Sequence, residues 1–270
     1  MLRRKYLVLL FFLCALSGWS QVNDSIEKSK DNLSYLLEDQ KWHISVPVWV
    51  PGFRGSFAYG GISLYPEDGE LDLIDRITDS NLNIEFYLIG ALEFKYRRLF
   101  VEIDGFKATL GSNLVFYDQE FLELNGTIEG AILRGVVGFS LYQRKQLDKL
   151  FKLEVLLYGG VRYYDLHIYT ENRNILNIKP RWAEPIFGLK VPISYRRWHF
   201  SAKGDVGGVA SSATQSWFVH GDVGYRFSRL FSLGLGWSVL DFTHDRDFDF
   251  KNLDLAIRLT GPTMNIRFSF

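Results

Sequence analysis

The sequence has one cysteine, Cys14, and it lies in an N-terminal segment that we expect to be removed from the mature protein. Without a thiol, the mature chain can form no disulfide scaffold, thiolate metal site or cysteine nucleophile. The sequence also lacks an excess of charge, since 31 basic residues are balanced by 31 acidic ones. It has no basic stripe that could neutralise the phosphates of a nucleic acid, so we expect no nucleic-acid partner.

Long apolar runs are absent after residue 20, so no transmembrane helix is predicted there. Residues 1–20 instead have the order of a cleavable signal peptide: three basic residues, an apolar stretch over 6–16, and small residues at Gly18 and Ser20. Cleavage near Gln21 would leave 28 basic against 31 acidic side chains, a formal charge of −3. We therefore expect an exported protein.

Aromatic residues are abundant at 16% of the chain, glycine contributes 24 residues, and mean hydropathy is near neutral. This combination is typical of a membrane barrel, in which each strand places only alternate residues in lipid. A soluble β-sandwich shares the alternation, so composition alone does not separate the two. Residues 21–40 indicate a polar periplasmic lead-in, and residues 41–270 form one predicted domain because no linker or repeat divides them.

Alternation of apolar and polar residues with period two predicts the strands. The segment 82–96 has eight positions on one face and no charge among them, which is long for a soluble domain. It fits a tilted transmembrane strand of about 9–11 residues with an extension beyond the membrane. We therefore predict an all-β fold, a single transmembrane antiparallel β-barrel of about ten strands (range 8–12). The predicted strands are 41–50, 82–96, 99–104, 121–142, 151–168, 184–195, 198–209, 217–227, 231–242 and 253–270.

The connections between these strands alternate in length. Bacterial barrels have short periplasmic turns and longer external loops, and an even strand count returns both termini to the periplasm. The predicted periplasmic turns, which are the shorter or more basic ones, are 97–98, 143–150, 196–197 and 228–230. The predicted external loops are 52–81, with a short helix over 71–77, and 110–120, 170–182, 210–216 and 243–250.

The last strand carries the sharpest local pattern. Ile266, Phe268 and Phe270 alternate with polar residues, and the chain stops on the aromatic. This resembles the C-terminal signal by which the barrel assembly machinery recognises outer-membrane barrels, so we expect that machinery as a partner. Earlier in the same segment the apolar residues are odd-numbered rather than even-numbered, which predicts a bulge or a tight turn across 260–263. A turn there would change the strand count by one or two.

Several phrases between residues 155 and 270 resemble a family of mostly uncharacterised Gram-negative outer-membrane barrels, distantly similar to the small OmpA- and OmpW-type barrels. The resemblance implies an outer-membrane location with contact to lipid and lipopolysaccharide, and it implies no catalytic residues. The phrases are GGVRYYDL at 159–166, EPIFGL at 184–189, KGDVGG at 203–208, GDVGYRF at 221–227 and GP at 261–262.

Charged residues of both signs fall on faces predicted to point into the barrel. A ten-strand barrel is only slightly wider than the eight-strand size that side chains can fill. We therefore predict an ion network in a narrow or closed lumen. The expected members are Glu85, Glu93, Lys95, Glu102, Asp104, Arg162, Lys203, Asp205, Asp222 and Arg226.

An enzymatic alternative uses Ser201, His220 and Asp222, because some outer-membrane barrels deacylate lipid A with serine and histidine. Such a site must lie where acyl chains arrive and must have an oxyanion pocket. All three residues are predicted to point inward, and no nucleophile-elbow sequence is present, so a structural ion network is the favoured interpretation. Histidines are scattered, and the acidic loop at 241–249 lacks the glycine and glutamate of a calcium loop. We expect no metal or cofactor.

Six tryptophans fall near predicted strand ends, and we interpret them as an interfacial aromatic girdle rather than as a sugar-stacking surface. They are Trp42, Trp49, Trp182, Trp198, Trp217 and Trp237. The predicted function is therefore a structural or narrow small-solute barrel with a plugged lumen. Two alternatives remain: a lipid-modifying hydrolase of the outer membrane, and a soluble periplasmic lipocalin-like binder whose apolar faces turn inward.

Overall fold

The computed structural model describes residues 42–49, 52–59, 62–65, 84–116, 122–170, 176–208, 214–248 and 251–270. The predicted signal peptide (1–20), the lead-in (21–40) and the short helix at 71–77 lie outside the described residues. Every regular element in the described ranges is a β-strand. These ranges contain no helix with the length and apolar character needed to cross a membrane.

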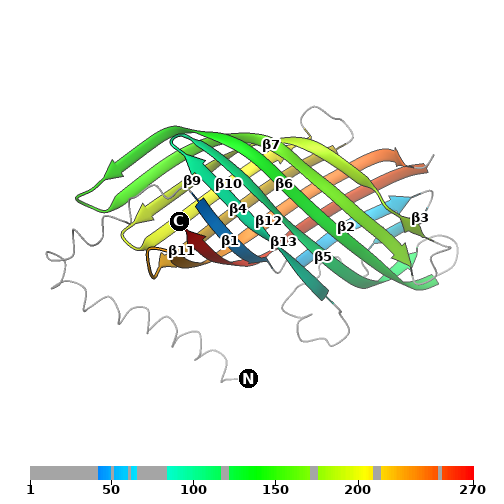
Figure 1. The fold of residues 1–270 in the computed structure, drawn as a ribbon. Coiled ribbons are helices and arrows are strands. Elements are labelled where there is room, and N and C mark those ends of the chain that lie inside the picture. The colour runs from blue at the N-terminus through cyan, green and yellow to red at the C-terminus, as the bar shows by residue number, and fades with distance from the viewer. Residues whose placement is uncertain are drawn as a thin grey trace, which may run out of the picture.

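The strands appear along the chain in the order that Figure 1 shows. Their bounds are β1 Trp42–Trp49, β2 Gly52–Tyr59, β3 Ile62–Tyr65, β4 Ile84–Tyr96, β5 Leu99–Phe116, β6 Leu122–Gln146, β7 Phe151–Thr170, β8 Asn177–Ile178, β9 Arg181–Tyr195, β10 Trp198–Gly207, β11 Thr214–Arg226, β12 Phe231–Phe248 and β13 Lys251–Ser269.

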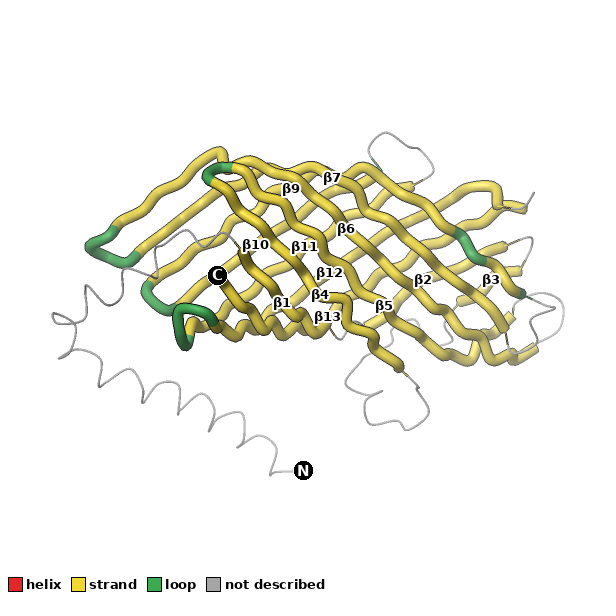
Figure 2. Tube along the Cα trace, in the orientation of Figure 1, coloured by secondary structure: helices red, strands yellow, loops and turns green. Residues whose placement is uncertain are grey.

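These elements form a closed barrel of ten antiparallel strands, with the two-residue β8 paired to β7 outside the main path. β1 and β2 together make the first barrel strand, since both pair with β13. β3 and β4 make the second, since both pair with β5. Pairing of β1 with β13, from His43 opposite Ser269 to Trp49 opposite Thr263, closes the sheet on itself (Figures 1 and 2). The prediction of about ten strands is confirmed.

Several strands run further than the alternation predicted. β2 and β3 occupy the first part of the loop predicted at 52–81, β5 continues to Phe116, and β12 continues to Phe248. The extension of β12 has polar outward residues at Thr243 and Asp245. Beyond the membrane, outward-facing residues need not be apolar, so the alternation of apolar and polar residues disappears. The sequence there has the pattern of a loop, although the hydrogen-bonded pairing of the strands continues.

The bulge or turn predicted across 260–263 is wrong. β13 pairs with β12 without a register shift from Lys251 to Phe268, and its odd-numbered residues face the interior along the whole length. The apolar face changes because the surroundings change. At the external end the lumen is apolar and takes Leu255 and Leu259, whereas at the periplasmic end the outer wall is apolar and takes Met264 and Phe268.

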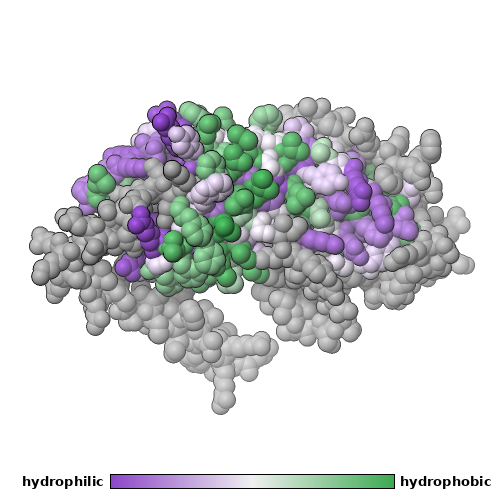
Figure 3. Space-filling view, in the orientation of Figure 1, coloured by the Kyte–Doolittle hydropathy of each residue, from purple (hydrophilic) through white to green (hydrophobic). Residues whose placement is uncertain are grey.

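An apolar band on the outer wall identifies the part that lies in lipid. Large apolar side chains such as Leu133, Phe187 and Leu235 are exposed there, and Figure 3 shows hydrophobic residues across the middle of the visible face with hydrophilic residues at both ends. Two ion pairs lie on the outer wall beyond the band, Arg181 with Asp165 and Arg258 with Asp241. An exposed apolar belt is the opposite of what a soluble lipocalin-like binder requires.

Four of the six tryptophans predicted to form a girdle face outward. Trp42, Trp198 and Trp237 are exposed on the outer wall, and Trp217 lies beside Arg258 there, with the guanidinium 5.4 Å from its ring centre. The other two, Trp49 and Trp182, face the lumen. Their position near the ends of predicted strands did not distinguish a lumen-facing residue from a lipid-facing one.

Candidate functional site

The external end of the lumen is filled by an apolar cluster. Tyr164 stacks on Trp182 with ring centres 4.5 Å apart, and Phe242 packs against Tyr164 at 4.8 Å. The other face of Trp182 stacks on His244 at 4.3 Å. We call this group the external plug. Its buried members are Tyr59, Ile132, Tyr164, Leu166, Ile168, Leu176, Ile178, Trp182, Leu240, Phe242, Leu253, Leu255, Ile257 and Leu259.

Below the external plug lies a buried ion network centred on Arg134 of β6. Its guanidinium donates to Asp205 at 2.9 Å and to the two Asp104 oxygens at 3.1 and 3.2 Å, and it also pairs with Glu102. Arg134 is 4% exposed. A charged group in that position is stabilised only when opposite charges replace the water it has lost.

Arg162 of β7 forms the second centre of the network. Its Nη1 donates to Ser216 at 2.8 Å and pairs with Glu184 at 3.3 Å, while its Nη2 pairs with Asp205. The Asp205 side chain is completely buried and lies between the two guanidiniums. One carboxylate therefore joins the charges of four neighbouring strands, β6, β7, β9 and β10.

Two lysines extend the network toward the periplasmic end. Lys190 donates to Glu93 at 2.5 Å and to Glu102 at 2.6 Å, and Lys203 donates to Glu102 at 2.8 Å. A separate buried pair joins Lys95 to Glu154 between β4 and β7. Nearly every charge in this part of the lumen thus faces a charge of opposite sign.

The structure brings most of the expected network residues together. Glu93, Glu102, Asp104, Arg162, Lys203 and Asp205 belong to the connected network. Lys95 forms its own pair, Asp222 contacts His220, and Arg226 is at the periplasmic end of β11.

The side chain of Glu85 lies outside the described part of the chain, so its place in the expected network stays a prediction. The backbone of Glu85 pairs with Thr109, and the register of β4 against β5 shifts between Ile89 and Ala91.

Three central members of the network were missed from the sequence: Arg134, Glu184 and Lys190. Arg134 lies in β6, and Glu184 and Lys190 both lie in β9; each has apolar or small residues on both sides along the chain. The sequence does contain a signal for Arg134, because it is even-numbered like Ile132 and Val136, which also face inward. Since side chains alternate between the two faces of a strand, this numbering places Arg134 in the lumen.

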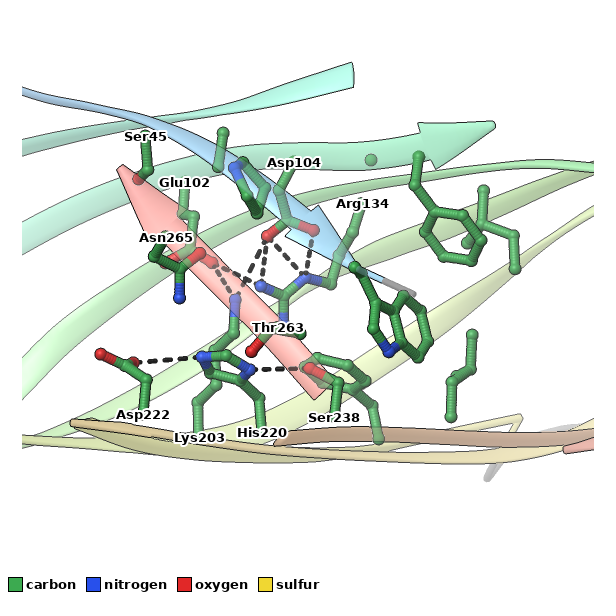
Figure 4. Close-up of a pocket in the computed structure, with 18 of the residues that line it drawn as sticks. Ser45, Glu102, Asp104, Arg134, Lys203, His220, Asp222, Ser238, Thr263 and Asn265 are labelled. Atoms are coloured by element: carbon green, nitrogen blue, oxygen red, sulfur yellow. Dashed lines mark hydrogen bonds and ion pairs between the residues drawn. The ribbon is translucent and has the colours of Figure 1, made fainter. Parts of the chain in front are cut away.

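Between the ion network and the wall formed by β11 to β13 and β1 lies a cavity of about 290 Å³. One side of it is charged, with Glu102, Arg134 and Lys203. The other side carries shorter polar side chains, among them Asp222 and Ser238 (Figure 4), and Ser45, Thr263 and Asn265 also line the cavity. Short side chains on the second wall leave the space that the cavity occupies.

His220 lies at the centre of the second wall and joins a serine to an aspartate. Its Nδ1 is 2.7 Å from Ser238 Oγ and its Nε2 is 3.1 Å from Asp222 Oδ1 (Figure 4). Ser201, the serine expected from the sequence, lies opposite Asp222 on the neighbouring strand and also lines the cavity. The hydroxyl partner of His220 is nevertheless Ser238 of β12. The register of β11 against β12 places Ser238 directly opposite His220, and the sequence pattern does not show which residues of neighbouring strands stand opposite each other.

Some buried polar atoms beside the cavity have no hydrogen-bond partner among the residues that the structure describes. They are Asp222 Oδ2, Thr263 Oγ1 and Trp49 Nε1. A polar cavity with such groups is suited to water or to a small polar molecule. The ranges that the structure describes contain no group of three or more histidine, aspartate, glutamate or cysteine residues that could hold a metal ion.

No protein-family model and no curated relative matches the chain. Among solved structures, it is similar to the outer membrane protease OmpT from Escherichia coli, with a TM-score of 0.52, 9% identity, and coverage of 86% of this chain and 97% of that one. Matches to the translocator domain of the autotransporter NalP from Neisseria meningitidis (TM-score 0.33, 8% identity, 95% and 98% coverage) and to Ail, the attachment invasion locus protein of Yersinia pestis (0.25, 9%, 84% and 99%), are weaker. The chain therefore has the fold of bacterial outer-membrane β-barrels, and this likeness indicates no particular activity.

Proposed function

We propose that this chain is an integral outer-membrane barrel with a closed lumen. In this proposal the barrel has a structural role, does not act as a general diffusion pore and has no enzymatic activity. The observation that carries the proposal is the double filling of the lumen. The external plug occupies the outer end, and the ion network crosses the barrel below it. In an open channel the charged side chains would be hydrated, whereas Arg162 is 2% exposed and the Asp205 side chain 0%.

The proposal includes the route to the membrane. A signal peptide at residues 1–20 would direct export, and the last strand would be recognised by the barrel assembly machinery. Phe268 and Phe270 point away from the lumen and are 39% and 57% exposed, which leaves them accessible before the barrel is surrounded by lipid. Lipid and lipopolysaccharide would then cover the apolar band.

Conductance of the purified, folded protein in planar bilayers tests the closed lumen. We expect no stable conductance steps at protein concentrations that give steps with a general porin. Heat-modifiable migration on gels provides the control that the inserted protein is a folded barrel. Large, stable steps from heat-modifiable protein would show that the plug and network do not close the lumen.

A second candidate function rests on the contact between Ser238, His220 and Asp222. A histidine that bridges a hydroxyl and a carboxylate is the arrangement of serine hydrolases. In that reaction Ser238 Oγ would attack an ester carbonyl and pass its proton to His220. The alcohol would leave with that proton, and a water molecule would then release the acid. A cavity of about 290 Å³ fits a small ester rather than lipid A, since cavities of about 150 Å³ hold benzene.

Labelling with a small fluorophosphonate and hydrolysis of p-nitrophenyl acetate test this candidate. Labelling that disappears in Ser238→Ala and persists in Ser201→Ala would support it, because both serines line the same cavity and only one contacts His220. Equal labelling of the wild type and Ser238→Ala, or no labelling of either, would exclude it.

A further inference from the structure

The periplasmic turns carry a strong excess of positive charge. The exposed cations there are Arg97-Arg98 in the β4–β5 turn, Arg144-Lys145 and Lys149 around the β6–β7 turn, Arg196-Arg197 in the β9–β10 turn and Arg229 in the β11–β12 turn. We call this group the basic collar. Asp148 is the one acidic residue exposed among these turns. The net charge of the chain is zero, so this excess is a property of one end of the barrel.

Two of these turns repeat the same short sequence. Tyr96-Arg97-Arg98 joins β4 to β5, and Tyr195-Arg196-Arg197 joins β9 to β10. In both, the first arginine has a positive φ, 55° at Arg97 and 54° at Arg196. Asparagine or glycine adopts this left-handed conformation more readily than arginine. Leu150 in the β6–β7 turn also has a positive φ, 49°, so the conformation belongs to these turns and is not specific to arginine.

The guanidiniums lie against the lipid-facing wall. Arg97 is 5.4 Å from the ring centre of Tyr96, Arg196 is 5.4 Å from that of Tyr195, and Arg98 is 6.0 Å from that of Phe139. These three rings are outward-facing and between 43% and 48% exposed. They form the periplasmic edge of the apolar band, where the headgroups of the inner leaflet begin. The stacking thus holds the cations at the depth of lipid phosphates.

The four arginines of the two repeated turns have no carboxylate partner in the part of the chain that the structure describes. Elsewhere in the barrel several arginines are paired with carboxylates, for example Arg134 with Asp205 in the lumen and Arg258 with Asp241 on the outer wall. A guanidinium presents a planar fork that matches phosphate oxygens. The two repeated turns therefore offer phosphate-binding groups that have no carboxylate partner among the described residues.

We propose that the two Tyr-Arg-Arg turns bind the phosphates of anionic phospholipids, such as phosphatidylglycerol, in the periplasmic leaflet of the outer membrane. The proposal relies on the outer-membrane orientation with short turns in the periplasm and is independent of whether the lumen conducts. Anionic rather than zwitterionic lipid is favoured because the collar has eight cations against one carboxylate. Lipopolysaccharide occupies the other leaflet, at the opposite end of the barrel.

Brominated lipids test the proposal, because bromine quenches the fluorescence of Trp42 and Trp198 at this edge of the band. The full mature protein is folded into vesicles that contain brominated phosphatidylglycerol or brominated phosphatidylcholine, and the relative affinity of the two lipids is measured. We expect phosphatidylglycerol to bind about five-fold more tightly, the factor that one basic residue near an anionic surface contributes. The preference should fall as salt rises.

The variant Arg97→Asn/Arg196→Asn separates lipid binding from folding. Asparagine relieves the positive φ, so this variant should be at least as resistant to urea as the wild type while its preference for phosphatidylglycerol falls several-fold. Arg181→Gln on the external side is the matched control and should keep the preference. An unchanged preference in the double variant would overturn the proposal. The proposal would also be overturned if the double variant kept its preference for phosphatidylglycerol and lost binding to isolated peptidoglycan, because the basic collar would then bind the cell wall.

Discussion

Replacing Arg134 by methionine should destabilise the barrel more than any single change on its surface. Methionine has a similar length and no charge, so the variant removes the guanidinium and largely keeps the volume. Three carboxylates lose a partner, those of Glu102, Asp104 and Asp205. The side chains of Glu102 and Asp205 are 5% and 0% exposed, so water cannot replace the lost charge without opening the lumen.

The size of the effect follows from what remains around these carboxylates. Removal of one partner from a buried ion pair costs about 3–5 kcal/mol. Lys190 and Lys203 still neutralise Glu102, and Arg162 still neutralises Asp205. We therefore expect a loss near the lower limit, about 3 kcal/mol, which is more than a hundredfold change in the folding equilibrium. Urea titration of the protein in lipid vesicles, followed by tryptophan fluorescence and by gel mobility, measures it.

Arg181→Met is the control, because Arg181 forms an exposed pair with Asp165 on the outer wall, and exposed pairs contribute little to stability. A second check is Arg134→Met/Asp104→Asn, which removes the carboxylate that keeps only Lys203, at 3.5 Å, as a partner and should recover part of the loss. If Arg134→Met were as stable as Arg181→Met, the network would have to be hydrated. The argument for a closed lumen would then be refuted.

Three further predictions concern packing and assembly. In Gly138→Ala the new Cβ would overlap the Phe100 ring and lie 2.7 Å from the Leu157 carbonyl oxygen, so a loss of about 1–3 kcal/mol is expected in urea titration. Gly135→Ala on the same strand has nothing within 4 Å of its Cβ and should leave stability unchanged. Phe242→Ala empties the centre of the external plug and should cost about 3–5 kcal/mol; a variant as stable as the wild type would show that the plug is loosely packed. Deletion of Phe270 should lower the yield of heat-modifiable protein in outer membranes, and an undiminished yield would exclude it from the assembly signal.

The fold was predictable because lipid imposes one rule on every strand. A strand such as 151–168 must place apolar residues outward within the membrane, and period-two alternation records that rule directly in the sequence. The rule ends where the lipid ends. Beyond the membrane the wall can be polar and the lumen apolar, as in the external half of β13, and there the sequence led to a bulge that does not exist.

The candidate site was predictable only in part for a related reason. The alternation of side chains along one strand shows which residues face inward, so Glu102 and Asp205 were predicted. The same alternation cannot show which inward residues of different strands meet. That Asp205 lies between Arg134 and Arg162 depends on the stagger of four strands, β6, β7, β9 and β10. That His220 contacts Ser238 rather than Ser201 depends on the register of β11 against its two neighbours.

By itself the sequence determined the all-β class, the count of about ten strands, the outward orientation of the apolar residues within the membrane and the basic character of the short turns. Each of these follows from the alternation of apolar and polar residues or from local composition. Only the tertiary structure decided which charged and aromatic side chains meet in the lumen, since they come from strands far apart in the chain. The same holds for the paired Tyr-Arg-Arg turns. Their sequences are local, but the position of their guanidiniums at the edge of the lipid band follows from the shape of the barrel.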